Sequence, residues 1–244
     1  MQVRLEQTGT TAHQTTMLEI ASFNAPSAIL AAKVGADRIE LCADYSAGGV
    51  TPALPTLHTI RSKLQELNID TPINIMIRPR GGNFTYSAAE FSQMKSSIAA
   101  FKSSHAVAGI VFGILTPDGQ IDGVRNAELV DAACPLPCTF HRAVDQVDDL
   151  DAAVQIIVDC GFTSILTSGG ARSAREGRTR VGEMQREYGG RISIVLGGGV
   201  RSANVLELKR ETGVEWVHSS AITGADEEVD EQEVRKMVEI LRDA

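Results

Sequence analysis

The segment KVGADRIEL, residues 33–41, reads as the end of a helix, a glycine, two linking residues and the start of a buried strand. Glycine suits the left-handed position at which a chain leaves a helix. The same order recurs in DCGFTSIL, residues 159–166, and in ETGVEWVH, residues 211–218, with a glycine in the same place. These three segments indicate a repeated helix-to-strand unit.

Short apolar segments alternate with amphipathic, helix-like stretches along the whole chain. Most of the apolar segments are rich in Ile, Val or Leu, as strands of parallel sheets are. This alternation predicts the α/β class and a TIM-type (β/α)8 barrel, with a doubly wound open sheet as the structural alternative. The predicted strands are residues 17–21, 38–42, 73–77, 107–113, 136–141, 164–168, 192–197 and 215–220.

Several of the intervening helices carry recognisable start signals. Asn24 and Pro26 open the first helix, and Ser87 with Glu90 matches a capping box at the third. Asp148 is the expected cap of the fifth helix. These signals place helices between the predicted strands, as a barrel requires.

Length and composition favour one soluble domain. The chain has 244 residues, close to the roughly 250 of a typical (β/α)8 domain. Residues 17–244 form the predicted barrel domain, and residues 1–16 a flexible N-terminal leader that lacks the apolar stretch of a signal peptide. The net charge of −8, without a block of Lys or Arg, repels nucleic acid and anionic membranes, so we expect neither as a partner. Four cysteines without a secretion signal predict reduced thiols and a cytoplasmic location.

Alternation of side chains along each strand predicts a polar barrel interior. In residues 38–42, Ile39 and Leu41 share the face that packs on helices, so the other residues of the strand point inward. The parity of the last three strands is ambiguous. The predicted inward residues are Glu19, Arg38, Glu40, Cys42, Asn74, Met76, Arg78, Thr139 and His141.

Charged side chains inside a barrel need partners, because an unpaired buried charge costs several kcal/mol. Glu19 and Glu40 could pair with the inward arginines in a network that only fixes the structure. The interpretation that we favour is a site at the C-terminal mouth, where barrel sites lie. Cys42, Arg78 and His141 all fall at the ends of strands, which places them at this mouth.

Arginines and glycine-rich loops at strand ends are typical of an anion site. IRPRGG, residues 77–82, follows the third strand, and TSGG, residues 167–170, and LGGGV, residues 196–200, end the sixth and seventh. Barrels often bind phosphate near their last two strands, although tight turns explain such glycines equally well. The candidate anion-binding residues are Arg38, Arg78, Arg80, Gly170 and Gly198.

Proton transfer has its own candidates. TFHRAVD, residues 139–145, places His141 at a strand end, where it could act as a general base or as a metal ligand. The catalytic candidates are His141 with Glu40 and Glu19 assisting it. A core histidine that is satisfied by a neighbour is the structural alternative. VHSS, residues 217–220, adds a further histidine of unknown orientation.

Sulfur atoms provide the candidate metal ligands, because copper(I) prefers soft sulfur and accepts imidazole. Cys42 and Met76 are both predicted to point inward. Cys134 and Cys138 flank the start of the fifth strand and are expected at the opposite end of the barrel, while Cys160 is expected in the core. Sulfur alone therefore supplies only a small metal site.

Taken together and in order, the motifs resemble those of the CutC copper homeostasis family. They are RIELC, AGGVTPA, MIRPRGG, GILTPDG, TFHRAVD, LTSGG, GGGV and VHSS, and with the first strand they cover most of the chain. The resemblance implies a cytosolic (β/α)8-type protein that is linked to copper homeostasis and copper binding. By motif, Cys42 matches the cysteine that the family uses as a proposed copper ligand.

The chain departs from the family pattern at three places. Relatives often have a second cysteine at the end of the first strand, where this chain has Ala21. Asn83 replaces the usual aspartate after RPRGG, and the short acidic segment 222–233 stands where many relatives have a longer insert. The first departure removes one ligand from a two-cysteine copper site.

Two functions are therefore expected. The first is a copper homeostasis protein that binds copper, as Cu(I), through Cys42 with Met76 or His141. The second is a barrel enzyme for a small anionic or phosphorylated substrate at the C-terminal mouth, with Arg78 and Arg80 holding the anion. No nucleotide cofactor is predicted. The expected partners are a copper ion or a small anionic ligand, and self-association into a homo-oligomer stays open.

Overall fold

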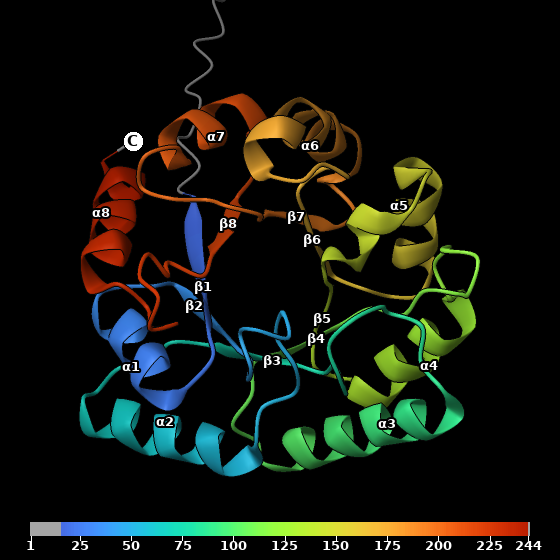
Figure 1. The fold of residues 1–244 in the computed structure, drawn as a ribbon, viewed down its shortest axis with the longest axis horizontal. Helices are drawn as coiled ribbons and strands as arrows, with labels where there is room; N and C mark the ends of the chain where they lie inside the picture. The colour runs from blue at the N-terminus through green and yellow to red at the C-terminus, as the bar shows by residue number, and fades with distance from the viewer. Residues whose placement is uncertain (1–15, 244) are drawn as a thin grey trace, which may run out of the picture.

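The strands close on themselves in chain order. In the computed structural model, which describes residues 16–243, eight parallel strands form a closed barrel from β1 to β8. Figure 1 shows the helices as an outer ring around these strands. Because β8 (Trp216–Ser219) pairs with β1 (Met17–Ser22), the open-sheet alternative is wrong and the TIM-type (β/α)8 barrel is confirmed.

All eight predicted strands are present, most of them trimmed at their ends. The remaining strands are β2 (Arg38–Leu41), β3 (Ile73–Met76), β4 (Gly109–Phe112), β5 (Cys138–Phe140), β6 (Ser164–Thr167) and β7 (Ser193–Leu196). The helices are α1 (Ala25–Lys33), α2 (Leu54–Glu66), α3 (Ala88–Ser103), α4 (Gly123–Ala133), α5 (Leu150–Asp159), α6 (Ala174–Tyr188), α7 (Val205–Thr212) and α8 (Glu231–Arg242), with a short 3-10 helix, η1 (Arg142–Gln146). None of these described helices combines the length and apolar character needed to cross a membrane.

The N-terminal segment is described only from Thr16 onward. The predicted leader, residues 1–16, therefore lies outside the described residues except for its last member. Thr16 is buried, and its hydroxyl donates a hydrogen bond of 3.3 Å to the carbonyl of Val214. Thr16 thus belongs to the folded barrel.

Start signals place most helices correctly. Asn24 caps α1, and Ser87 with Glu90 forms the predicted capping box of α3. The prediction that Asp148 caps α5 is wrong. Asp149 caps this helix instead, because its carboxylate accepts hydrogen bonds from the N–H groups of the first helical turn.

Successive strand residues face two different environments, as the alternation predicted. Ile39, Leu41 and Ile75 are fully buried between the strands and the helices. Burying each such side chain contributes about 1.5–3 kcal/mol, so this layer drives closure of the fold. Residues of the opposite parity form a polar interior, which includes Glu19, Glu40, Asn74, Thr139 and Ser164.

The pairing register arranges the interior side chains in rows. Glu19 on β1 lies opposite Arg38 on β2 and His218 on β8. Ala21, further along β1, lies opposite Glu40. Paired residues of neighbouring parallel strands face the same side of the sheet, because the side chains alternate in step. The row of Glu19 therefore lies beneath Glu40, which is nearer to the C-terminal mouth.

Candidate functional site

A cavity of about 170 Å³ lies at the C-terminal mouth of the barrel. Cys42 follows β2 directly, Arg78 lies just beyond β3, and His141 follows β5. Glu40 reaches the same cavity from within β2, so the predicted convergence of Glu40, Arg78 and His141 is confirmed. The lining residues are Ala21, Phe23, Glu40, Cys42, Gly48, Met76, Arg78, Phe84, His141, Arg142, Leu166, His218 and Ser220.

Two sulfur atoms share one wall of this cavity. Cys42 and Met76 pack together with Val111 in a small buried cluster, against which Phe23 lies. Burial and the nearby Glu40 carboxyl raise the pKa of the Cys42 thiol well above its usual value. The thiol is therefore protonated at neutral pH unless a ligand displaces the proton.

Beneath the cavity, Glu19 forms a row of polar contacts with its neighbours on β2 and β8. Its Oε2 accepts a hydrogen bond of 2.5 Å from Arg38 Nε, and its Oε1 lies 2.7 Å from His218 Nδ1. The guanidinium of Arg38 stacks over Trp216, 3.8 Å from the ring centroid. Burial alone would raise the pKa of Glu19, but the His218 hydrogen bond and the Arg38 charge outweigh it and lower the pKa to about 2. Glu19 is therefore a fixed, ionised carboxylate.

Glu40 has very different surroundings. Its Oε2 lies 3.5 Å from Cys42 Sγ, which donates to it, and 3.9 Å from His218 Nε2. Its Oε1 is buried and has no hydrogen-bond partner among the residues that the structure describes. Burial raises the pKa of Glu40, and the negative charge of Glu19 raises it further, against the opposing effect of His218.

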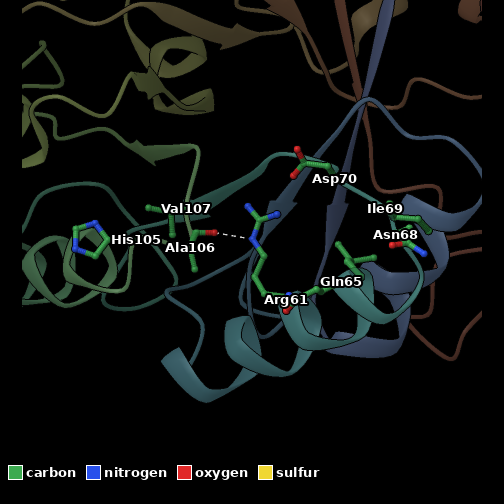
Figure 2. A pocket seen from close by; sticks show the side chains of 9 residues that line it. Arg61, Gln65, Asn68, Ile69, Asp70, His105, Ala106 and Val107 are labelled. Carbon is green, nitrogen blue, oxygen red and sulfur yellow. Dashed lines mark hydrogen bonds between the residues drawn. The ribbon is translucent and has the colours of Figure 1, made fainter.

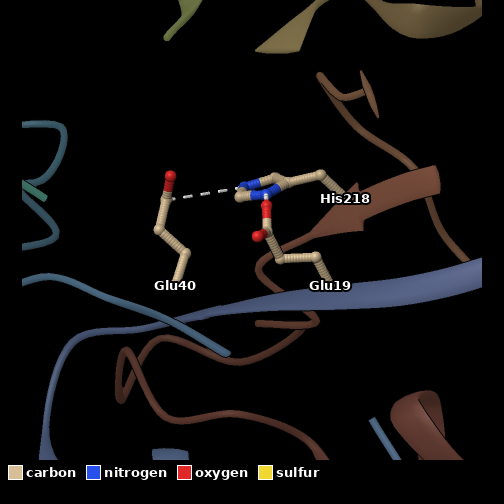
Figure 3. A group of neighbouring side chains, drawn as sticks. All are labelled: Glu19, Glu40 and His218. Atoms are coloured by element: carbon tan, nitrogen blue, oxygen red, sulfur yellow. Dashed lines mark hydrogen bonds and ion pairs between the residues drawn. The ribbon is translucent and has the colours of Figure 1, made fainter. Parts of the chain in front are cut away.

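His218 connects the two glutamates, as Figure 3 shows. One atom from each of Glu19, Glu40 and His218 lies within 4.8 Å of the others, so the group has the spacing of a metal site. Burial would lower the pKa of His218, but the two carboxyl groups outweigh burial and raise it. Sequence reasoning left its orientation open, because the alternation in β8 did not distinguish inside from outside.

His141 lies on another wall of the cavity and is oriented by its own backbone. Its Nδ1 accepts a hydrogen bond of 3.3 Å from the N–H of Ala143, so the ring proton is on Nε2. This Nε2 is buried and has no partner within residues 16–243. Burial and the charge of Arg78 lower the pKa of His141 to about 3, which keeps the ring neutral at physiological pH.

The sequence suggested that Arg78 could pair with a buried glutamate, but the structure gives it other partners. Its Nη1 donates to the carbonyls of Ala47, Gly48 and Gly49, and its Nη2 donates to the carbonyl of Gly82. A loop carbonyl attracts a guanidinium without adding a second buried charge. Arg78 therefore ties the loops after β2 and β3 together beside the cavity.

The other predicted anion-binding arginines bind partners outside the mouth cavity. Arg38 points into the interior but lies at the level of Glu19. Arg80 donates to Glu90 at the start of α3 and to the carbonyls of Asn83 and Thr85. Neither side chain lines the mouth cavity.

The glycine loop after β6 already holds an anion, and that anion is Asp145. The carboxylate accepts hydrogen bonds from the N–H groups of Ser168 and Gly170, from the hydroxyl of Thr167 and from Arg142. Gly198, in the loop after β7, lies beside the same arginine: a side chain there would meet the Arg142 guanidinium at 3.2 Å. The two predicted glycines thus adjoin an internal carboxylate–arginine pair and not the cavity.

The described cysteines are all free, and three of the four lie outside the mouth cavity. Cys138 is buried at the start of β5, Cys134 precedes it and is exposed, and Cys160 packs beside the core. Ala21, the first of the three departures noted in the sequence, lines the cavity and offers no ligand there.

A wider hollow of about 680 Å³ lies at the other end of the barrel (Figure 2). It is formed by the end of α2 and the segments that precede β3 and β4. Arg61 spans it and donates to the carbonyls of Ala106 and Thr71. Contacts at this end of a barrel usually serve stability, and the residues gathered here link helices to strand starts.

Known proteins resemble this chain in sequence and in structure. A CutC family protein of Mesorhizobium japonicum is 39% identical over 213 residues, which cover 87% of this chain and 80% of the relative. A human copper homeostasis protein cutC homolog is 39% identical over 210 residues, covering 86% and 75%. A CutC crystal structure from Streptococcus agalactiae superposes with a TM-score of 0.78 at 31% identity, covering 85% of this chain and 100% of that one.

More distant structures share the fold alone. Phosphoribosyl anthranilate isomerase from Thermotoga maritima superposes with a TM-score of 0.61 at 15% sequence identity. At this identity the similarity shows only the shared barrel fold and gives no information about activity. The CutC family model, in contrast, matches residues 16–223. This match and the relatives above show that the chain belongs to the CutC family.

Proposed function

We propose that this chain is a copper homeostasis protein that binds a copper ion in the mouth cavity, with Cys42 and Met76 as its soft ligands. The observation that carries the proposal is that these two sulfur side chains belong to one small buried cluster and both line that cavity. Copper(I) prefers thiolate and thioether sulfur. The names of the human and mouse relatives, which call them copper homeostasis proteins, support the same role.

The charges around the cavity favour a cation over an anion. Glu40 lines it and the ionised Glu19 lies directly beneath. Arg78 and Arg142 also line it, but both already have partners: Arg78 donates to loop carbonyls, and Arg142 donates to Asp145 and Ser168. A metal must displace the thiol proton of Cys42, and Glu40 Oε2, 3.5 Å from Sγ, is placed to receive it.

We also propose a cytoplasmic location for this protein. Free cysteines throughout the described chain fit the reducing conditions of the cytosol, where disulfides are rare. We accordingly propose that the barrel, described over residues 16–243, is one domain that acts in the cytoplasm on copper.

Copper(I) competition against a chromophoric chelator in oxygen-free buffer tests this function. We expect Cys42→Ala to bind Cu(I) at least tenfold more weakly than wild type, a loss of about 1.4 kcal/mol or more. Met76→Leu, which keeps the volume, should lose less. The matched control is Cys134→Ala, which removes an exposed thiol at the far end of the barrel. Equal affinities of wild type and Cys42→Ala would contradict the proposal.

A second candidate function is an enzyme for a small anionic or phosphorylated substrate. One observation favours it: His141, whose Nε2–H has no partner among the described residues, lines the same cavity as Arg78. His141 would donate this hydrogen bond to the substrate, with Glu40 as the neighbouring acid or base. Titration with inorganic phosphate, followed by the imidazole NMR signals, tests it. Signals of His141 that do not move at saturating phosphate would remove this candidate.

A further inference from the structure

We infer that the N-terminal end of the barrel binds a small monocarboxylate, in a second cavity that shares no lining residue with the mouth cavity. This cavity has a volume of about 190 Å³. Residues of β2, β3, β5, β6 and β8 meet in it, so it lies on the barrel axis. The inference goes beyond the proposed function and does not depend on copper binding. The lining residues are Arg38, Pro72, Asn74, Ala108, Pro137, Thr139, Thr163, Ser164 and Trp216.

Three buried polar residues on this cavity have side chains without a hydrogen-bond partner. Asn74, Thr139 and Ser164 are only 5%, 6% and 9% exposed, and their side chains form no hydrogen bond with any other residue that the structure describes. Buried polar side chains nearly always have partners in folded proteins. All three residues line the cavity, so a molecule bound there would supply the partners that the protein does not.

Arg38 gives the same cavity a positive charge. Its Nε donates to Glu19 and its guanidinium stacks over Trp216, but its Nη2 is buried without a partner in residues 16–243. Among the described residues that line the cavity, Arg38 alone is charged. A guanidinium can only donate hydrogen bonds, and its planar fork matches a carboxylate. We therefore keep Arg38 as an anion-binding residue, at this end of the barrel and not at the mouth.

A glycine makes room for the amide of Asn74. Gly109 lies opposite Asn74 in the pairing of β3 with β4. A β-carbon at Gly109 would lie 2.7 Å from Asn74 Oδ1 and 3.0 Å from the carbonyl of Pro137, so any larger residue would displace the amide. Because Oδ1 lies against this strand, the Nδ2 group of Asn74 remains as a hydrogen-bond donor for a bound anion.

The order of polar and apolar residues indicates the class of molecule. Pro72, Ala108 and Pro137 each directly precede a strand, so they form the outer rim of the cavity. Asn74 and Thr139 lie within the strands, further inside the barrel. This order fits a molecule whose carboxylate enters first and whose short hydrocarbon chain rests on the rim. Water or an inorganic ion would satisfy the polar groups but would bury no apolar surface against the rim.

Tryptophan fluorescence tests the inference, because Trp216 is the one tryptophan of the chain and lines this cavity. Wild type is titrated with sodium butyrate at constant ionic strength, and we expect a saturable change in the emission of Trp216. Thr139→Val and Ser164→Ala each remove one hydroxyl group with little change in volume. Each should weaken butyrate binding about tenfold, as expected for the loss of a hydrogen bond to a charged group.

Two further hydroxyl deletions serve as matched controls. Thr59→Val removes an exposed hydroxyl group on α2, and Ser220→Ala removes one that lines the mouth cavity. Both variants should bind butyrate as wild type does. Loss of the response in Ser220→Ala would place the butyrate at the mouth and overturn the inference. Thermal unfolding of each variant shows that it is folded, and either of Thr139→Val and Ser164→Ala serves if the other does not fold.

Titrations with sodium chloride and with n-butanol test the class of molecule. An equal response to chloride would show that the hydrocarbon chain contributes nothing, and an equal response to n-butanol would show that the carboxylate contributes nothing. Either result overturns the inference, as does a wild type without a saturable response, or wild-type affinity in the folded Thr139→Val and Ser164→Ala variants. None of these results bears on copper binding, because the two cavities share no lining residue.

Discussion

Two buried glutamates on neighbouring strands show how differently one barrel interior can treat the same side chain. Glu19, beneath the cavity, has both oxygens bonded and a pKa lowered to about 2. Glu40, at the cavity wall, has one oxygen without a partner in the described residues and a raised pKa. The first arrangement fixes structure, and the second leaves a group ready for a ligand.

The difference between the two glutamates separates a residue that stabilises the fold, Glu19, from one that is available to bind a ligand, Glu40. An unpartnered buried polar atom destabilises the fold by about 1–3 kcal/mol. A ligand that bonds to such an atom at a cavity wall removes this destabilisation. Glu40 and His141 both carry one at the mouth. Arg78 carries a third, at Nε, whereas in the lower row Glu19 has none and its partner Arg38 has one, at Nη2. We place the ligand at the mouth because three such residues line the cavity there.

The largest expected effect comes from breaking the lower row. Glu19→Gln leaves Arg38 and His218 in the interior without their carboxylate, and removing one partner of a buried ion pair costs about 3–5 kcal/mol. Urea unfolding measures the loss. Glu66→Gln, which breaks an exposed pair with Lys63, should cost less than about 1 kcal/mol. A loss of similar size in the two variants would contradict the structural role of Glu19.

Asp145→Asn should be the next most damaging change. The carboxylate joins η1 to the loop after β6 through Ser168 and Gly170, and it also accepts from Arg142 within η1. Hydrogen bonds to a charged group are worth about 1.5–3 kcal/mol. We expect a loss of about 2 kcal/mol in the free energy of unfolding. The neighbouring exposed Asp148→Asn should change it by less than about 0.5 kcal/mol, and a larger loss there would restore Asp148 as a structural residue.

Acid should destabilise the protein in two pH windows that overlap between about pH 4.5 and 3. The pKa of His141 is about 3 in the fold against 6.5 for a free imidazole, so the unfolded chain binds the extra proton between these values and stability falls as pH falls. The slope is at most about 1.4 kcal/mol per pH unit for one proton. His141→Gln should flatten this window in pH-dependent urea unfolding.

The second window belongs to Glu19, whose stabilising charge is present above pH 4.5 and is lost as pH falls toward about 2. It should persist in His141→Gln. An unchanged slope between pH 6.5 and 4.5 in that variant would show that His141 is not the residue responsible for the upper window.

The smallest expected change in stability, at Glu40, tests the contrast between the two glutamates most closely. Glu40→Gln removes a carboxyl group whose pKa is already raised, so the free energy of unfolding should change by less than about 1 kcal/mol or even increase. Urea unfolding beside Glu19→Gln measures the contrast directly. A loss of 3 kcal/mol or more would mean that Glu40 is as structural as Glu19.

The fold could be predicted almost completely from the sequence, because its signals are local. Alternation placed all eight strands, and Ser87 with Glu90 marked the start of α3. The error at Asp148 has a simple cause: two adjacent aspartates offer the same side chain, and only the path of the backbone decides which one reaches the first turn.

The candidate site could be predicted only in part, because it depends on contacts between distant segments. Alternation placed Glu40, Cys42, Met76, Arg78 and His141 around one cavity. It could not place His218, whose partner Glu19 is 199 residues away in the chain. Nor could it show that loop carbonyls satisfy Arg78 or that Asp145 occupies the glycine loop, since both depend on how turns fold back.

X-ray absorption at the copper edge of the Cu(I)-loaded protein tests the central claim most directly, namely that the cavity wall formed by Cys42 and Met76 binds the metal. We predict sulfur neighbours around copper in wild type and fewer of them in Cys42→Ala. A first shell made only of nitrogen and oxygen in wild type, or an identical shell in the two proteins, would contradict it.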